Sequence, residues 1–193
     1  MIDFETAIRD FLSQFTSTSS ASQSANTDFG ASYYSASKNI GWTEVKAGRI
    51  YTFDYPIKSP EESTSSFVDR RPILMIIPTP ANYPKGKIVG LDLVLLRPDL
   101  RGNLLRNLSS VVGLMFKDGT VANEQEVLDK LSRININFAK TLLSGFPVEK
   151  IVKGYDIRYI PGLIEIKIAD WVKIPYLSDF KIDGTTPNRI YNS

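Results

Sequence analysis

Three strand-like segments follow one another between Gly48 and Leu96, and this feature constrains the fold most. In residues 51–55 aromatic side chains alternate with polar ones, a period of two that predicts one buried and one wet face, with Thr52 on the wet face. Residues 73–77 are apolar throughout, which indicates a strand covered on both faces. Residues 88–96 alternate again. We therefore expect an antiparallel meander, arranged as a small β-barrel or a strongly twisted sheet.

The centre of the chain favours helices. Pro98 can occupy the first position of one helix, which residues 117–119 (Lys-Asp-Gly) would end. Its buried face is predicted to hold Leu100, Leu104, Leu108, Val111 and Met115. Asn123, followed by Glu126, resembles a capping box at the start of a second helix. Residues 138–143 predict a third, short helix.

The C-terminal third returns to strand-like patterns. Ile157 and Tyr159 alternate with Arg158, and residues 164–168 alternate isoleucine with charged side chains. A hairpin around the Pro161-Gly162 turn would pair these two segments. Together with the central helices, the pattern predicts an α+β fold.

Apolar residues also recur at helical spacing near the N-terminus. Phe4, Ile8, Phe11 and Phe15 form one stripe, and Asp3 is the expected N-cap. Two alternatives remain open for this helix: it packs on the chain's own core, or it docks onto a partner. Only polar or small residues occupy positions 16–26, and such a linker spans roughly 18 Å on average, enough for either arrangement.

These patterns divide the chain into four parts. We expect an amphipathic helix in residues 1–15, a polar linker and irregular segment in 16–47, an α+β domain in 48–183 and a C-terminal tail in 184–193. The N-terminus lacks the apolar run of a secretory signal. The longest purely apolar run is also far shorter than the roughly 20 residues of a membrane-spanning helix. We therefore expect synthesis in the cytoplasm and no membrane partner.

Composition limits the available chemistry. The chain has no cysteine and no histidine, which excludes thiolate nucleophiles, serine–histidine triads and histidine-ligated metals. Carboxylate chemistry, lysine chemistry or an oxygen-only cation site would remain possible. A formal net charge of +2 is too balanced to indicate nucleic-acid binding by bulk electrostatics. We expect no cofactor and no catalytic residue.

Arginine residues offer possible phosphate contacts at Arg70, Arg71, Arg97 and Arg101. Folding could bring these side chains into one patch. Solubility and ion pairing are the simpler explanation of the same residues, and the chain lacks both GxxxxGK[ST] and GxGxxG phosphate motifs.

One carboxylate lies in an unusual place. Asp92 is surrounded by apolar strand residues, yet alternation places it opposite Leu91 and Leu93. We therefore expect it on a solvated strand face.

Aromatic residues are numerous, with nine Tyr, ten Phe and two Trp. Core packing explains most of them, but Tyr and Trp are also enriched at protein interfaces. The interface candidates are Phe4, Ile8, Phe11, Phe15, Tyr33, Tyr34 and Tyr191.

The aromatic strand at 51–55, the Asp69-x-x-Pro72 sequence before a buried strand and the Gly90-Leu91-x-Leu93 sequence resemble a family of tailed-bacteriophage, myovirus-like virion proteins. Residues 154–171 extend the resemblance weakly. It implies a structural subunit of the tail, baseplate or neck, located in the virion, made in the host cytoplasm and bound to other virion proteins. Copies of the same chain in a symmetric assembly would be one such set of partners. The alternative is a DNA-associated phage protein for packaging or genome-end binding, acting through the arginines.

Overall fold

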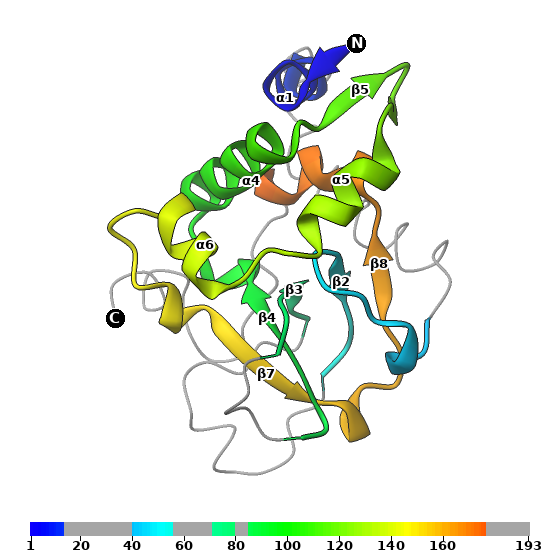
Figure 1. Ribbon diagram of the computed structural model, residues 1–193, viewed down its shortest axis with the longest axis vertical. Coiled ribbons are helices and arrows are strands. Elements are labelled where there is room, and N and C mark those ends of the chain that lie inside the picture. The colour runs from blue at the N-terminus through cyan, green and yellow to red at the C-terminus, as the bar shows by residue number, and fades with distance from the viewer. Residues whose placement is uncertain (14–39, 56–70, 80–84, 177–193) are drawn as a thin grey trace, which may run out of the picture.

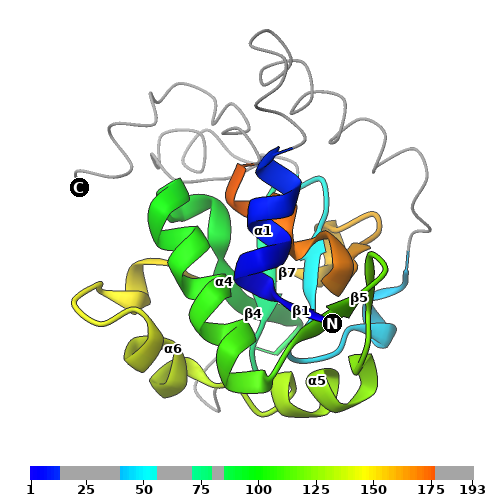
Figure 2. The same cartoon turned by 90° about the horizontal axis from the view of Figure 1, so that it is seen from above.

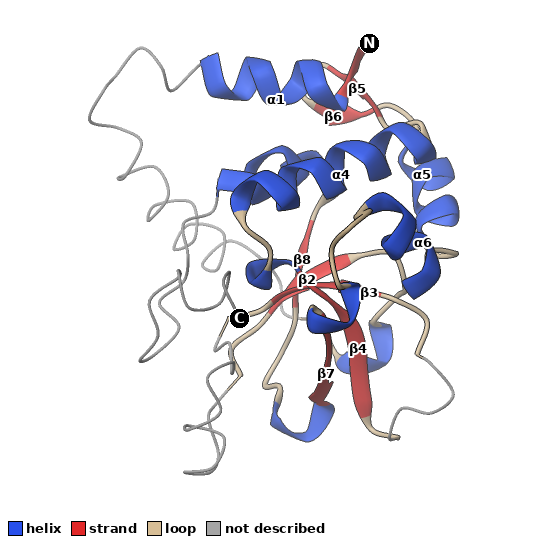
Figure 3. Ribbon diagram, turned by 90° about the vertical axis from the view of Figure 1, so that its left-hand side faces the viewer, coloured by secondary structure: helices blue, strands red, loops and turns tan. Residues whose placement is uncertain are grey.

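The computed structural model describes residues 1–13, 40–55, 71–79 and 85–176 (Figure 1). In this part of the chain the fold is α+β, with helices and two antiparallel sheets. The elements form layers: a five-stranded sheet is covered on one side by helix α4, and helix α1 lies beyond α4 (Figure 3).

The five-stranded sheet has the order β7-β4-β3-β2-β8, and all its pairs are antiparallel. Its strands are β2 (Ile50–Thr52), β3 (Ile73–Ile76), β4 (Lys87–Asp92), β7 (Val152–Asp156) and β8 (Ile164–Ile166). Strands β2, β3 and β4 form the predicted meander. The sheet does not close into a barrel, since β7 and β8 lie at opposite edges.

The predicted C-terminal hairpin is therefore wrong. Strand β7 pairs with β4, whereas β8 pairs with β2 on the far side of the sheet. The chain between them contains the 3₁₀ helix η4 (Ile157–Tyr159), for which Asp156 provides the cap. Alternation at Ile157 and Tyr159 suggested a strand, but this segment connects the two edges.

Both faces of the sheet are covered by apolar side chains. Ile73 and Met75 belong to the larger core cluster, while Leu74 and Ile76 belong to a second cluster. This confirms the two-sided burial predicted for residues 73–77. The predicted wet face of the first strand is confirmed at Asp54, which is exposed, but is wrong at Thr52, which is buried.

Strand β4 ends earlier than predicted. Asp92 is its last residue, and the 3₁₀ helix η2 (Leu93–Leu95) follows directly. Within the strand, an added Cβ at Gly90 would lie 2.5 Å from the Met75 carbonyl oxygen. This position therefore has no room for a side chain.

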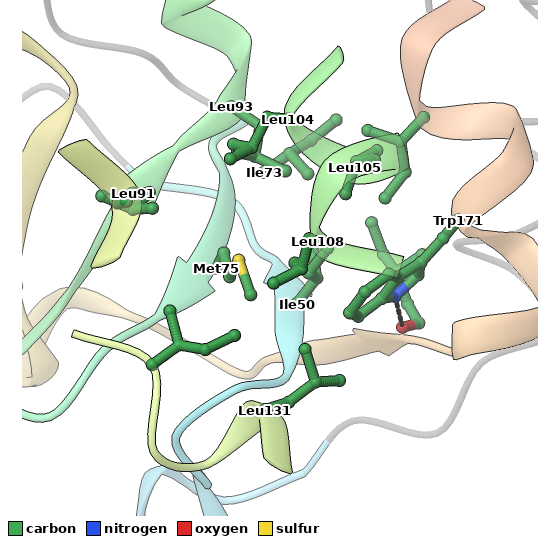
Figure 4. Packing of buried hydrophobic residues seen from close by; sticks show 14 of the residues in the cluster. Ile50, Ile73, Met75, Leu91, Leu93, Leu104, Leu105, Leu108, Leu131 and Trp171 are labelled. Carbon is green, nitrogen blue, oxygen red and sulfur yellow. Dashed lines mark hydrogen bonds between the residues drawn. The ribbon is translucent and has the colours of Figure 1, made fainter. Parts of the chain in front are cut away.

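Helix α4 (Pro98–Val112) is the main cover of the sheet, and Pro98 is its first residue, as predicted. The residues that it buries against the sheet include Leu104, Leu105 and Leu108 (Figure 4). Val111 is 56% exposed, so its predicted place on the buried face is wrong.

The helix also ends before the predicted stop at 117–119. Gly113 has a left-handed backbone with φ of 70°, and its N–H donates to carbonyls of the last turn. Met115 consequently lies in strand β5 (Met115–Lys117) rather than in the helix.

A small sheet lies beside the N-terminus, where β5 pairs with β1 (Ile2–Asp3) and β6 (Thr120–Val121). Helix α1 (Phe4–Ser13) follows β1 directly. Asp3 Oδ1 accepts a hydrogen bond of 2.8 Å from the Thr6 N–H, which is the N-cap predicted for Asp3. The helix packs against α4 and the 3₁₀ helix η5 (Ile168–Tyr176) (Figure 2).

Two further helices flank α4, and both begin near the expected positions. Asn123 precedes α5 (Glu124–Leu131), but its side chain bonds Met115 N and Gly113 O instead of forming the predicted capping box. The third helix is α6 (Ile136–Leu142), where Asn135 Oδ1 accepts from Phe138 N. The remaining short helices are η1 (Trp42–Glu44) and η3 (Val148–Lys150).

Among the described residues, no helix has the length and apolar character needed to cross a membrane.

Candidate functional site

Three polar side chains are buried around the point where β4 passes through η2 into α4, and we call them the buried polar cluster: Asp92, Arg101 and Tyr155. Asp92 ends β4, Arg101 lies in the first turns of α4, and Tyr155 belongs to the edge strand β7. Their exposed fractions are 0%, 1% and 7%. Buried ionisable groups are the usual places to look for chemistry, so their partners decide what this cluster can do.

Arg101 directs its guanidinium at backbone carbonyls. Its Nε donates to Leu93 O at 2.9 Å, and its Nη atoms donate to Leu96 O at 3.0 Å and Ile174 O at 3.2 Å. The first two carbonyls belong to η2 and its cap, and the third to η5. One side chain therefore connects the end of β4, the start of α4 and the last described helix.

Asp92 accepts two hydrogen bonds. The Tyr155 hydroxyl donates to Oδ2 at 2.6 Å, and the Val94 N–H donates to Oδ1 at 3.2 Å. The second bond makes Asp92 the N-cap of η2. The Asp92 carboxyl, at the end of β4, therefore bonds both the edge strand β7 and the 3₁₀ helix η2.

The predicted solvated face for Asp92 is wrong. Asp92 lies directly opposite Leu74 in the antiparallel pair, so both side chains point to the same face of the sheet. Leu74 belongs to the second apolar cluster and is itself fully buried. Alternation correctly separated Asp92 from Leu91, but the face it points to is covered too.

Burial raises the pKa of Asp92 to about 6, and desolvation is the largest cause. The hydrogen bonds from Tyr155 and Val94 act in the opposite direction, as do the charges of Lys153 and Arg101. The Asp92 carboxyl therefore changes its charge in the weakly acidic range rather than near pH 4.

Aromatic rings surround the Tyr155 side of this cluster. The Tyr155 ring lies edge-on to Phe53 at 5.2 Å and to Tyr55 at 5.1 Å between centroids. Phe53 is buried in the same apolar cluster. These rings cover the phenol and help to keep water from the Asp92 carboxylate.

The predicted phosphate contacts that the structure describes do not all lie on the surface. Arg101 is buried, so its assignment to phosphate binding is wrong: its donors are directed at the protein's own carbonyls. Arg97 and Arg71 are exposed, and each contacts a carboxylate, Asp99 and Asp54 respectively. Arg70 lies outside the described residues.

Some of the predicted interface residues lie in the core of the chain instead. Phe4 and Ile8 are buried in the chain's own core, and Phe11 packs against it. Phe4 and Ile8 are therefore not available to a partner, and the described α1 takes the first of the two alternatives, packing in cis. The other interface candidates lie outside the described residues: Phe15, Tyr33, Tyr34 and Tyr191.

In residues 1–13, 40–55, 71–79 and 85–176, no group of three or more carboxylates could hold a metal ion. Comparison with known proteins gave no further assignment: no family model matches the chain, no curated protein matches it, and no solved structure matches it.

The sequence signal for the buried polar cluster was present but incomplete. Asp92 lies next to a strand with two covered faces, and a neighbour in such a sheet is buried whichever way it points. No periodicity indicated Tyr155 as its partner. Arg101 shares helical spacing with Arg97, and this suggested a common exposed face although only Arg97 is exposed.

Proposed function

We propose that the chain is a non-catalytic structural subunit of a tailed-phage particle, in the tail, baseplate or neck. The resemblance in residues 51–96 supports the lineage. The observation that supports the structural role is that the buried ionisable groups bind to the protein itself. Arg101 donates hydrogen bonds to backbone carbonyls, and Asp92 accepts hydrogen bonds from Tyr155 and Val94. These bonds connect β4, β7, η2, α4 and η5.

In this proposal the described residues act as a stiff body. Helix α1 belongs to that body, because Phe4 packs against Phe116 with ring centroids 6.3 Å apart and Ile8 is buried. We therefore assign contacts with neighbouring virion proteins to the outer surface of the body and to the tail 184–193, rather than to a free N-terminal helix.

The DNA-associated alternative loses its strongest residue pair, because Arg101 faces inward while Arg97 faces outward. A gel shift at low and moderate salt with an Arg97→Glu variant tests it. The structural proposal expects no shift at moderate salt and no effect of the substitution. Salt-sensitive binding that the substitution weakens would favour the DNA alternative.

Gene silencing with complementation tests the structural role in cells. Without the chain, we expect electron microscopy to show incomplete particles. An Arg97→Ala gene should restore complete particles, since that side chain is exposed and pairs only at the surface, whereas Arg101→Ala should not, since the body would lose its internal connections. Complete and infectious particles in the absence of the chain would contradict the proposal.

A further inference from the structure

The contact between Asp92 and Tyr155 lies at an edge of the sheet rather than in its middle. Among the described residues, β7 has β4 as its single strand partner. Four of its five residues are only half buried, while Tyr155 is buried. The phenol of a partly accessible edge strand therefore closes one side of a fully buried carboxyl.

The ladder between β4 and β7 shows which backbone groups hold this edge in place. Asp92 N donates to Ile151 O, and Ile157 N donates to Gly86 O. In an antiparallel pair, every second residue of a strand directs its backbone N–H to the partner strand. The register therefore places the backbone amides of Lys153 and Tyr155 toward β4 as well. These two amides report directly on whether β7 is paired.

Charged and titratable groups face Asp92 from two elements. Tyr155 and Lys153 belong to β7, and Arg101 belongs to α4. Arg101 is held by carbonyls of η2 and η5, so it does not move with β7. Separation of β7 from β4 would remove the Tyr155 hydroxyl and admit water to the carboxyl.

We propose that ionisation of Asp92 controls local opening of the β7 edge: the neutral carboxyl keeps β7 closed, and the carboxylate increases the population of a minor state in which β7 separates from β4 and water solvates the charge. A buried carboxylate is costly even with two hydrogen bonds, and opening an edge strand is the shortest route to hydration. This inference is independent of the proposed function, since it needs no particle and no partner.

Amide hydrogen exchange tests the proposal on the full chain. Protection is measured relative to the intrinsic rate at each pH for Lys153 and Tyr155 in β7 and for Leu105 in α4. From pH 5 to pH 7.5 the two β7 amides should lose about tenfold in protection, the change expected when a carboxyl with a pKa of about 6 returns to its ordinary value on opening. Opening should be local, so their exchange should respond less to low urea than that of Leu105.

Asp92→Asn should abolish this pH dependence, because the amide does not titrate in this range. Asp129→Asn, an exposed change on α5, is the matched control and should retain it. If Asp92→Asn fails to fold, Tyr155→Phe replaces it: losing a hydrogen bond that lowers the pKa of Asp92 should move the midpoint to higher pH. Unchanged β7 protection across the pH range would overturn the proposal. The same would follow from β7 exchange that matches Leu105 in rate and urea response, or from a midpoint unmoved by Tyr155→Phe.

Discussion

At the scale of single residues, the guanidinium of Arg101 shows why a charged side chain can be fully buried. A carbonyl at the end of a strand or 3₁₀ turn needs a donor, and Arg101 supplies donors to Leu93, Leu96 and Ile174 at once. The dipoles of these backbone carbonyls stabilise the positive charge. Such a residue stabilises a particular path of the chain.

Removing that side chain should be costly. We expect Arg101→Ala to lower the free energy of unfolding by about 3–5 kcal/mol, because buried carbonyls lose their donors and a cavity forms. Arg97→Ala, at an exposed pair four residues earlier, should change it by at most about 0.5 kcal/mol. Urea unfolding of both variants measures this, and equal effects would contradict the assigned role of Arg101.

Ser109 presents the opposite case, a buried hydroxyl on α4 that has no hydrogen-bond partner within the described part of the chain. Ser109→Ala should leave stability unchanged or raise it by up to about 1 kcal/mol, because the unpaired hydroxyl is removed. The neighbouring Leu108→Ala should instead cost about 2–5 kcal/mol through loss of packing. Thermal unfolding compares the two. A marked loss of stability in Ser109→Ala would show that its hydroxyl is bonded.

Asp92 should make stability depend on pH. Its folded-state pKa of about 6 exceeds the ordinary value of 3.8, so the folded protein holds this proton more tightly than the unfolded chain. The resulting stabilisation is fully present below pH 3.8 and is lost as pH rises through 6, about 3 kcal/mol in total.

Urea unfolding between pH 5 and 7.5 measures the Asp92 contribution, which should be about 1.4 kcal/mol in this window. Asp92→Asn should remove it. Glu126 and Glu149 have a lowered pKa through hydrogen bonds to Lys130 and Lys140, so their titration lies below this window. A wild-type slope that persists in Asp92→Asn would assign the effect to another group.

At the scale of elements, the N-terminal helix shows which properties a local sequence pattern predicts and which depend on the rest of the fold. Its helical period and the Asp3 cap are local properties, and the sequence predicts both. Whether its stripe packs in cis depends on a complementary surface, which α4, β5 and η5 provide from distant parts of the chain. Periodicity contains no information about that partner.

A substitution in the stripe tests the packing in cis. Phe4→Ala should lower the free energy of unfolding by about 3–5 kcal/mol, because Phe4 is buried and contacts Phe116. Arg9→Ala on the exposed side of α1 should have little effect. A Phe4→Ala variant that melts like the wild type would show that α1 contributes nothing to the body.

The turn before β2 depends on a close approach that only glycine permits. Gly48 has φ of 81°, and an added Cβ would lie 2.3 Å from the Leu131 carbonyl carbon at the end of α5. Gly86 has nearly the same φ, 82°, with nothing within 4 Å of an added Cβ. A substitution at Gly86 therefore tests backbone strain alone, whereas one at Gly48 tests backbone strain together with a steric clash.

Gly86→Ala should cost about 1 kcal/mol, the strain of a left-handed residue alone. Gly48→Ala should cost at least about 2 kcal/mol more, because β2 or α5 must shift. Denaturant unfolding of both variants makes the comparison. Equal losses would mean that α5 can move away freely.

At the scale of the whole molecule, local patterns predicted the α+β class, the β2–β3–β4 meander and the starts of the helices. They did not predict which strands become neighbours, because β7 and β8 are adjacent in sequence yet lie at opposite edges of the sheet. They also misplaced Asp92 and Arg101. Both are polar residues whose burial depends on donors or acceptors contributed by other elements.

We propose that the described residues form a stiff body that is part of a phage particle, and the presence of the chain in purified particles tests this proposal most directly. The measurement is quantitative mass spectrometry of purified, nuclease-washed particles from the proposed source phage, with empty heads and separated tails analysed alongside. We expect a fixed copy number per particle in the tail or neck fraction. Absence of the chain from washed particles would contradict the structural assignment.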